Sequence, residues 1–373
     1  MRAKFSTVVI MLVFAVSTFG FVQSMNWYER VKESTPVDTL AIHTNTIRSL
    51  AFSSDRTKLL TCSNDMTLKV YDLSAKAIDK TLKMQDIKLS QRLSQVWGGK
   101  GVSGYYKAIF GPDGATVISG SPDTDVIIWD LPSQAERRRL KGHEQPVSRL
   151  ALTKDGRYLV SQSASEVIIW DAKTWVESRR IKSGALITRN FLIKATDLII
   201  DFALSSDQSK LYALTGKGLI TGFSFPEGQQ IFQFQHDARV IGYSNYECIA
   251  VSPDGRFLAD GNVHGGITVW DIEQKKIIKT FGHWDSPSGY LPSVYEITFI
   301  KDGSKLLTAC ADGTSRLWTV ASPKDEADIY FGLHGNKATE QKGVFALGVS
   351  LDGKVFATGG VDATIRLWEI PSE

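Results

Sequence analysis

Leu306–Trp318 reads Leu-Leu-Thr-Ala-Cys-Ala-Asp-Gly-Thr-Ser-Arg-Leu-Trp, and Ala357–Trp368 reads Ala-Thr-Gly-Gly-Val-Asp-Ala-Thr-Ile-Arg-Leu-Trp. In both stretches an apolar run leads into a turn at an aspartate, and a second run ends on tryptophan. An aromatic residue ends an apolar run in the same way at four earlier positions: Tyr71, Trp129, Trp170 and Trp270. Successive members lie 41 to 58 residues apart, except for one interval of 100 that has room for two units. Such recurrence indicates a repeat architecture, because one unit cannot bury its own apolar face.

Tight turns separate the first two apolar runs of most units. They are Pro112-Asp113-Gly114, Asp155-Gly156, Pro253-Asp254-Gly255, Asp302-Gly303 and Asp352-Gly353. Asp-Gly between apolar runs is a strong hairpin signal, because glycine adopts the positive φ that such turns require. A more polar run, such as Glu136–Leu140 or Lys276–Phe281, follows the tryptophan and supplies a fourth strand. After the N-terminal segment no helical periodicity of useful length appears, so the sequence predicts an all-β protein.

Over roughly Pro36–Ile370 these motifs resemble the WD-repeat family of β-propellers. The resemblance implies a single domain, residues 36–373, of seven antiparallel blades with four strands each. The third strands of the blades are expected to end near Tyr71, Trp129, Trp170, Phe223, Trp270, Trp318 and Trp368. The fourth blade, Asp197–Gln235, lacks both the histidine and the tryptophan, but its apolar runs still predict four strands.

The two ends of the repeat region fit together. The last blade stops after its third strand at Ile370, and an unassigned apolar strand, Val37–Ile42, precedes the first blade. We expect residues 37–42 to supply the missing outer strand of the last blade. Closure of this kind removes the exposed sheet edges that promote aggregation.

In the family, a histidine ahead of each blade forms a buried hydrogen-bond tetrad with Ser/Thr, Asp and Trp. The resemblance places such structural tetrads at His43, Thr61, Asp65 and Tyr71; Ser119, Asp123 and Trp129; His143, Ser161 and Trp170; His283, Thr308, Asp312 and Trp318; and His334, Thr358, Asp362 and Trp368. The second blade lacks the histidine, and the third lacks the aspartate. In the fifth blade Asp260 and His264 occupy the Ser/Thr and Asp positions, where an Asp–His pair could substitute.

A repeated Ser/Thr-His-Asp set could also indicate a nucleophilic triad or a metal site. Its recurrence from blade to blade favours a structural role, since a hydrolase needs one exposed nucleophile and a metal needs its ligands gathered in one place. Residues 99–104 match GxGxxG, but the strand-like Tyr106–Phe110 follows instead of the helix that a dinucleotide site requires. We therefore expect no catalytic residue, cofactor or metal.

Composition excludes several classes of partner and site. The formal net charge is only +3 in 373 residues, which gives no electrostatic basis for binding nucleic acid. The basic run Arg137–Arg139 is typical of a solvated edge strand. The three cysteines, Cys62, Cys248 and Cys310, lie in apolar runs without CxxC spacing, so they predict buried free thiols.

The N-terminal segment indicates targeting. Arg2 and Lys4 precede an uncharged stretch, residues 5–22, whose apolar core Val8–Val16 has the size of a signal-peptide h-region. Residues 1–24 are therefore expected to be a cleaved signal peptide or an uncleaved membrane anchor, followed by a linker at residues 25–35. Cleavage would make the protein periplasmic or extracellular, and retention would tether it to a membrane. A third possibility is an intracellular protein whose apolar start has another role.

Long connections between blades carry aromatic residues and form the predicted partner-binding face. By the family's topology these connections all emerge on one side of the disc. The candidates are Trp97, Tyr105, Tyr243, Tyr246, Trp284 and Tyr290. Exposed Trp and Tyr are typical interface anchors, and loops on a rigid scaffold often carry function.

The favoured function is a non-enzymatic scaffold, a monomeric propeller inside a complex, that binds a protein or peptide on this face. The alternative is a propeller enzyme or small-molecule binder whose site is at the mouth of the central channel. A pocket lined by two or more titratable residues outside the tetrads would favour the alternative.

Overall fold

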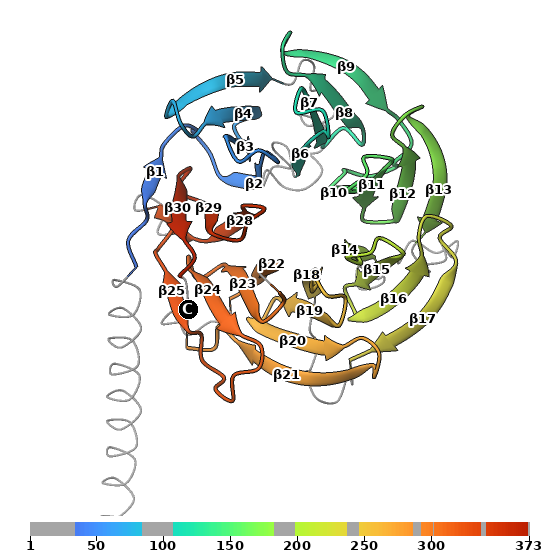
Figure 1. Ribbon diagram of the computed structural model, residues 1–373, viewed down its shortest axis with the longest axis vertical. Helices are drawn as coiled ribbons and strands as arrows, with labels where there is room; N and C mark the ends of the chain where they lie inside the picture. The colour runs from blue at the N-terminus through green and yellow to red at the C-terminus, as the bar shows by residue number, and fades with distance from the viewer. Residues whose placement is uncertain are drawn as a thin grey trace, which may run out of the picture.

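The computed structural model describes residues 34–83, 107–182, 198–236, 246–285, 292–300, 302–336 and 341–371. Within these residues all regular structure is β, and seven four-stranded antiparallel sheets form a closed ring (Figure 1). The predicted seven-bladed propeller is confirmed. The predictions for residues 1–33 concern residues outside this range.

Blades 1 to 6 are each built in chain order from the centre of the ring outward, and blade 7 takes its outermost strand from the segment that precedes blade 1. Blade 1 contains β2 (Ile47–Phe52), β3 (Lys58–Ser63), β4 (Thr67–Asp72) and β5 (Ala77–Lys83). Blade 2 contains β6 (Ala108–Phe110), β7 (Thr116–Gly120), β8 (Val126–Asp130) and β9 (Ala135–Leu140). Blade 3 contains β10 (Arg149–Leu152), β11 (Tyr158–Ser163), β12 (Glu166–Asp171) and β13 (Val176–Lys182). Blade 4 contains β14 (Ile199–Leu204), β15 (Lys210–Thr215), β16 (Leu219–Ser224) and β17 (Gln230–Gln235).

The remaining blades follow the same plan. Blade 5 contains β18 (Tyr246–Val251), β19 (Phe257–Asn262), β20 (Gly266–Asp271) and β21 (Lys276–Gly282). Blade 6 contains β22 (Val294–Ile300), β23 (Lys305–Cys310), β24 (Ser315–Thr319) and β25 (Ile329–Phe331). Blade 7 contains β28 (Val344–Val349), β29 (Val355–Gly360), β30 (Ile365–Glu369) and β1 (Asp38–Leu40). A short hairpin of β26 (Gly335–Asn336) and β27 (Gln341–Lys342), which the sequence did not predict, precedes blade 7.

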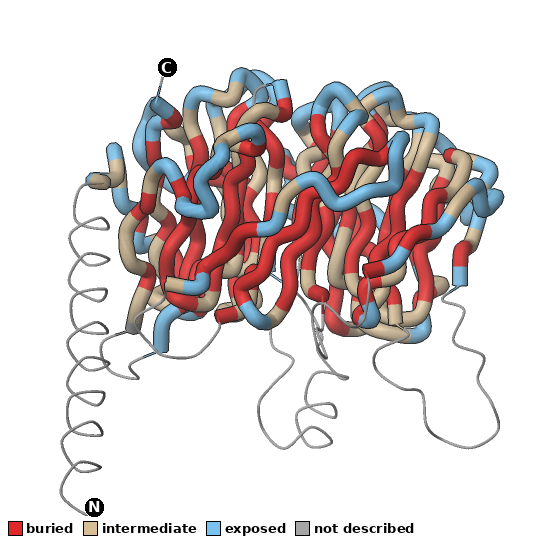
Figure 2. Tube along the Cα trace, turned by 90° about the horizontal axis from the view of Figure 1, so that it is seen from below, coloured by how far each residue is buried: buried red, intermediate tan, exposed pale blue. Residues whose placement is uncertain are grey.

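The second and third strands of each blade are buried on both sides because a neighbouring blade packs against each face. Seven apolar clusters fill the seven blade-to-blade interfaces, and each cluster draws residues from two adjacent blades. Figure 2 shows the buried residues running through the thickness of the disc, with exposed residues in the turns at its surface. The core is therefore a ring of equivalent interfaces, which explains why the sequence repeats.

The predicted closure is present, although the strand is shorter than expected. β1 covers Asp38–Leu40 instead of residues 37–42, and it pairs antiparallel with β30 (Figure 1). The backbone N–H of Val37 also donates to the carbonyl of Leu367 at 2.8 Å. Leu40 is buried with Tyr71 and Leu367, so the closing strand packs against both the last and the first blade.

Blade 4 forms without a tetrad because aromatic residues fill its outer layer. Phe232 lies 5.8 Å from Tyr212, and Phe234 lies 4.9 Å from Trp270 of the next blade. Gly222 makes room for this layer, since a Cβ there would come within 2.5 Å of the Phe232 ring. The four strands predicted for this blade are all present.

None of the described residues belongs to a helix long and apolar enough to cross a membrane.

Candidate functional site

The tetrads of blades 6 and 7 are assembled as the resemblance implied. In blade 7, His334 contacts Thr358 through Nε2 at 2.7 Å and Asp362 through Nδ1 at 2.9 Å. The indole Nε1 of Trp368 donates to the Thr358 hydroxyl at 2.9 Å. Each polar group in this buried chain therefore has a partner, as buried polar groups require.

Blade 6 adds a buried cation to the same arrangement. His283 contacts Thr308 at 2.9 Å and Asp312 at 3.1 Å, and Trp318 donates to Thr308 at 3.0 Å. Arg316, whose exposed fraction is 0%, donates to Asp312 at 2.8 Å and also pairs with Asp285. Burial alone would raise the pKa of Asp312, but its contacts with His283, Arg316 and Thr314 hold that pKa well below the usual range.

The arginine partners of these aspartates were missed at the sequence level. Arg366 of blade 7 donates to Asp362 at 3.0 Å, in the position that Arg316 holds in blade 6. A signal was present, because both repeats carry arginine four residues after the aspartate and two before the tryptophan. These arginines extend each tetrad into a charged network.

Blades 1 and 2 hold incomplete versions of the tetrad. His43 contacts Thr61 and Asp65, each at 2.7 Å, but among the described residues no hydrogen bond joins the Tyr71 hydroxyl to Thr61. In blade 2, Trp129 donates to Ser119 at 2.9 Å. Asp123 is not brought to them, and its buried Oδ1 has no hydrogen-bond partner in the described structure.

In blade 3, which lacks the aspartate, Nδ1 of His143 contacts the Ser163 hydroxyl at 3.1 Å, and Glu166 lies close to the same nitrogen. His143 contacts Ser161 at 2.6 Å, and Trp170 donates to Ser161 at 2.8 Å. Glu166 is 2% exposed, lies 3.4 Å from Nδ1 of His143 and accepts from Arg180 at 2.6 Å. The turn before β12 is short, so Glu166, the first residue of the strand, comes close to His143. An acid at that point of the sequence was the available signal.

In blade 5 an Asp–His pair does substitute, but with a different histidine from the one expected. Asp260 accepts from Trp270 at 2.7 Å and contacts His236 at 2.9 Å. His264 is exposed and lies in the turn between β19 and β20. His236 is the histidine that pairs with Asp260, because it directly follows the end of β17 and packs between two rings, Tyr246 at 4.6 Å and Trp270 at 4.6 Å.

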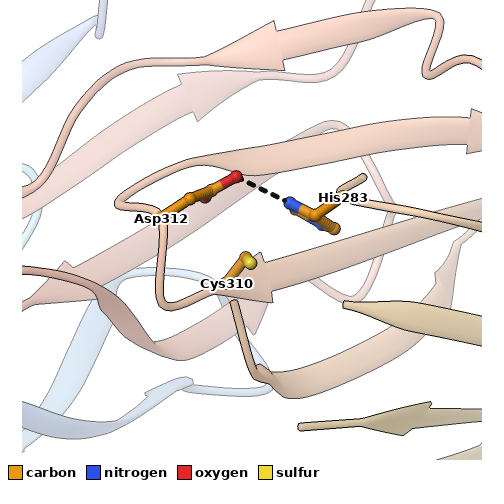
Figure 3. A group of neighbouring side chains, drawn as sticks. All are labelled: His283, Cys310 and Asp312. Carbon is orange, nitrogen blue, oxygen red and sulfur yellow. Dashed lines mark hydrogen bonds and ion pairs between the residues drawn. The ribbon is translucent and has the colours of Figure 1, made fainter. Parts of the chain in front are cut away.

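Figure 3 shows the one group in the described residues with metal-ligand chemistry, His283, Cys310 and Asp312. Their ligand atoms lie within 4.8 Å of one another, and all three residues are buried. Both nitrogens of His283 are already hydrogen-bonded, and the Arg316 guanidinium occupies Asp312. Burial raises the pKa of the Cys310 thiol well above its usual value, which disfavours the thiolate. The group fits a structural tetrad better than a metal centre.

Buried histidines predict that stability falls in mild acid. Burial, and then the Arg180 guanidinium, lowers the pKa of His143 to about 4. Its unfolded-state pKa is about 6.5, so between these values only the unfolded chain takes up the proton. The contribution of His143 is intact above pH 6.5, and on the order of 2–3 kcal/mol is lost as the pH falls toward 4. Urea midpoints at pH 7.5 and pH 5 test this. A His143→Gln variant should show a weaker pH dependence, and an equal dependence would contradict the account.

The structure describes two of the six predicted surface aromatics. Trp284 is 49% exposed, beside the connection that follows blade 5. Tyr246 was wrongly placed among the partner-binding residues: it begins β18, is 3% exposed and stacks on His236. Its ring fills the space beside the variant tetrad of blade 5, which explains its burial. Trp97, Tyr105, Tyr243 and Tyr290 lie outside the described residues.

The repeat is also recognised by comparison with known families. The model described as WD domain, G-beta repeat matches residues 34–72, 99–130, 134–171, 275–319 and 332–369, which together exceed half of the chain. The chain belongs to the WD-repeat family. The stretch between the third and fourth matches holds blade 4, which has no tetrad, and most of blade 5, whose tetrad is altered.

Several WD-repeat proteins are similar to this chain. It is 22% identical over 364 residues to the guanine nucleotide-binding protein subunit beta of Oryza sativa subsp. japonica, covering 91% of this chain and 87% of that protein. It is 21% identical over 364 residues to WD repeat-containing protein 1 of Xenopus tropicalis, covering 88% and 54% respectively. It is 33% identical over 116 residues to Protein Atg16l2 of Homo sapiens, covering 31% and 17%. The chain thus spans about half or less of the length of the last two relatives.

WD-repeat propellers generally act as protein-interaction scaffolds and are generally not enzymes. The feature that would favour a different activity is nevertheless present in this WD-repeat ring. The central channel contains a cavity of about 170 Å³ lined in part by Lys107, Arg149, Asp201 and Glu296. None of these four titratable residues belongs to a tetrad. They come from four different blades, and the sequence alone gave no signal that they would meet.

Proposed function

We propose that this WD-repeat protein is a non-enzymatic scaffold, exported or membrane-tethered, that binds a protein or peptide on the face of its long inter-blade connections. The general role of WD-repeat propellers supports the coarse part of this proposal. The finer part, the face and the location, depends on particular residues.

The observation that supports this choice of face is that the backbone next to the exposed Trp284 side chain is held in place by a network of contacts. The neighbouring Asp285 accepts a hydrogen bond from the Tyr330 hydroxyl at 2.8 Å and pairs with the buried Arg316. The Arg316 guanidinium in turn lies 4.6 Å over the Tyr330 ring. The backbone beside Trp284 is therefore held by the same network that fixes the blade 6 tetrad. A large side chain exposed on a fixed backbone loses little conformational entropy when it is buried by a partner.

The topology adds a second argument. In a four-stranded antiparallel blade, the connection to the next blade and the turn between the second and third strands lie on one side of the disc. Trp284 lies in such a connection, and Asp312 lies in such a turn. This side therefore carries both the tetrad histidines and the long connections, whereas the turn at Leu351 lies on the opposite side.

Substitution of Trp284, alone and together with Trp97, is expected to weaken partner capture. Trp284→Ala should weaken binding by roughly 2 kcal/mol or more, about 30-fold, as for an interface anchor. Adding Trp97→Ala should weaken it further. Pull-down with quantitative mass spectrometry measures the effect, with Leu351→Ser on the opposite face as the control because Leu351 is 83% exposed. Unchanged partner recovery by the double variant, with normal melting, would eliminate this face.

The location is tested separately. Residues 5–22 are uncharged and follow Arg2 and Lys4, which supports export or tethering. N-terminal sequencing of the purified protein together with fractionation distinguishes the alternatives. A mature chain that begins near Met25 in a soluble exported fraction is expected if the segment is cleaved, and an intact chain in the membrane fraction if it is an anchor. An intact chain in the cytosol would contradict both.

A further inference from the structure

The innermost strands of five blades share a deviation at the same point. In blades 1, 4, 5, 6 and 7 the pairing of the first and second strands shifts by one residue near the start of the first strand. The extra residues are Arg48, Ile200, Glu247, Tyr295 and Phe345. Each follows a buried residue and is itself half-buried. Because a β-bulge turns a side chain out of the regular alternation, these five residues share one position at the start of the innermost strands. The innermost strands surround the centre of the ring (Figure 1), and we call the end at which these strands start the channel mouth.

Three consecutive blades make an aromatic arc from this set. The rings of Tyr295 and Phe345 stack with centroids 4.5 Å apart and planes at 22°. The guanidinium of Arg48 lies 4.8 Å from the centroid of the Phe345 ring. One end of the arc thus already accepts a cation on an aromatic face, a contact in which the ring quadrupole attracts positive charge.

Glu247 of blade 5 occupies the position next to Tyr295 of blade 6 in this set of bulge residues. Among the described residues it makes no hydrogen bond or ion pair. Burial raises the pKa of its carboxyl; Arg149 opposes this shift and Asp201 adds to it. Burial and then the Glu247 charge raise the pKa of Tyr295, which is consistent with the two side chains being neighbours.

The other charged groups around the channel are already paired. Lys107 of blade 2 reaches across to Glu296 of blade 6 at 2.6 Å. Glu296 also accepts from the backbone N–H of Leu347 at 2.8 Å. Arg149 donates to Asp201 at 3.0 Å, and Asp201 accepts from the backbone of Ile249 at 3.1 Å. Glu247 is therefore the carboxyl group near the channel that has no hydrogen bond or ion pair among the described residues. The cation that acts on it, Arg149, already donates to Asp201 at 3.0 Å.

The inner strands also line a cavity, whose lining residues do not include Glu247 or Tyr295. The cavity of about 170 Å³ is lined by residues further along the same inner strands, including Asp201, Ile249 and Glu296. This volume equals that of roughly five or six water molecules in the liquid, so it suits the head and short tail of a small molecule.

We propose that the channel mouth binds a small organic cation, with its ammonium or guanidinium group between the Glu247 carboxylate and the Tyr295 ring. An anion would meet an unpaired carboxylate at this point. A divalent metal ion would find one carboxylate there instead of the several oxygen ligands that it requires. A delocalised or alkylated monovalent cation satisfies both the carboxylate and the aromatic face. The site does not depend on the protein-docking face, because its residues are separate from Trp284.

Calorimetric titration of the full chain tests the proposal, with methylguanidinium and ethylammonium chlorides as probes. At least one cation is expected to bind with one-to-one stoichiometry, whereas the neutral analogue methylurea and sodium chloride at equal ionic strength do not. Glu247→Gln is expected to weaken binding roughly tenfold or more, and Tyr295→Leu severalfold. Glu227→Gln is the matched control, since Glu227 is exposed in the turn between β16 and β17.

Folding and the source of the cation are checked in the same experiment. Glu247→Gln removes a desolvated charge, so its melting temperature should equal or exceed that of the wild type. A short peptide with one lysine or arginine serves as a second arm: binding of the free cations indicates a free ligand, and binding of the peptide alone indicates a basic side chain of a partner. The proposal is overturned if neither arm binds, if methylurea binds as well as the cations, or if Glu247→Gln binds as tightly as the wild type.

Discussion

Deletion of residues 36–42 is expected to make the protein oligomeric or insoluble. The deletion removes β1, whose register with β30 pairs Asp38 with Leu367, Thr39 with Arg366 and Leu40 with Ile365. It also removes Leu40 from the core that joins the last blade to the first. The backbone groups of β30 would then form an open edge, which can pair with the edge of another molecule.

Light scattering and thermal unfolding by circular dichroism measure this outcome. Val37→Ala is the control within the same segment, because Val37 is 64% exposed and its backbone contact is unchanged by the substitution. Leu40→Ala should give an intermediate result, a loss of about 2–5 kcal/mol with closure retained. A monodisperse deletion product that unfolds in one cooperative transition would show that the closing strand is dispensable.

Asp312→Ala is expected to be the most damaging single substitution in the tetrads. It removes the 2.8 Å partner of Arg316, which is 0% exposed and would keep only its pair with Asp285. It also removes the hydrogen-bond partner of His283 Nδ1. Removal of one member of a buried ion pair typically costs about 3–5 kcal/mol, because the remaining charge stays desolvated. For a domain of this size that corresponds to a fall in melting temperature of roughly 4–7 °C.

Asp362→Ala is the matched comparison. Asp362 makes the equivalent contacts with His334 and Arg366, but the side chains of Arg366 and Asp362 are 18% and 11% exposed. Water can reach the arginine that the substitution leaves behind, so the loss of stability should be smaller. Denaturant unfolding of both variants ranks them. Equal losses, or a specific activity lost from Asp312→Ala at unchanged melting temperature, would count against a purely structural role.

The strands and the number of blades were predictable because the sequence patterns that indicate them are local. The same holds for His43, His283 and His334, which each contact the expected threonine and aspartate. Asp-Gly turns, apolar runs and the spacing from Thr358 to Trp368 all lie within one blade, where short-range geometry decides the outcome. Glu166 and Arg316 were missed although their positions relative to the tryptophan were visible. Their roles depend on a shortened turn and on burial inside a packed blade, and neither is evident from residue type alone.

The sequence also could not show which of the candidate partner-binding aromatic residues are exposed. Tyr246 and Trp284 both follow a histidine in a connection between blades, so the sequence treats them alike. Packing separates them, because Tyr246 stacks on His236 inside the disc while Trp284 remains half exposed. Which aromatic residue is available to a partner is therefore a property of the assembled ring.

The sequence by itself determined the all-β class, the seven repeated sheets and the closure by an N-terminal strand, because each repeat encodes its own turns and buried faces. Only the tertiary structure decided what occupies the centre of the ring. Lys107 and Glu296 are 189 positions apart, yet they meet across the channel, and Glu247, Tyr295 and Phe345 reach its mouth from three blades. Ring closure sets these neighbours, and no local pattern along the chain records which blades will face one another.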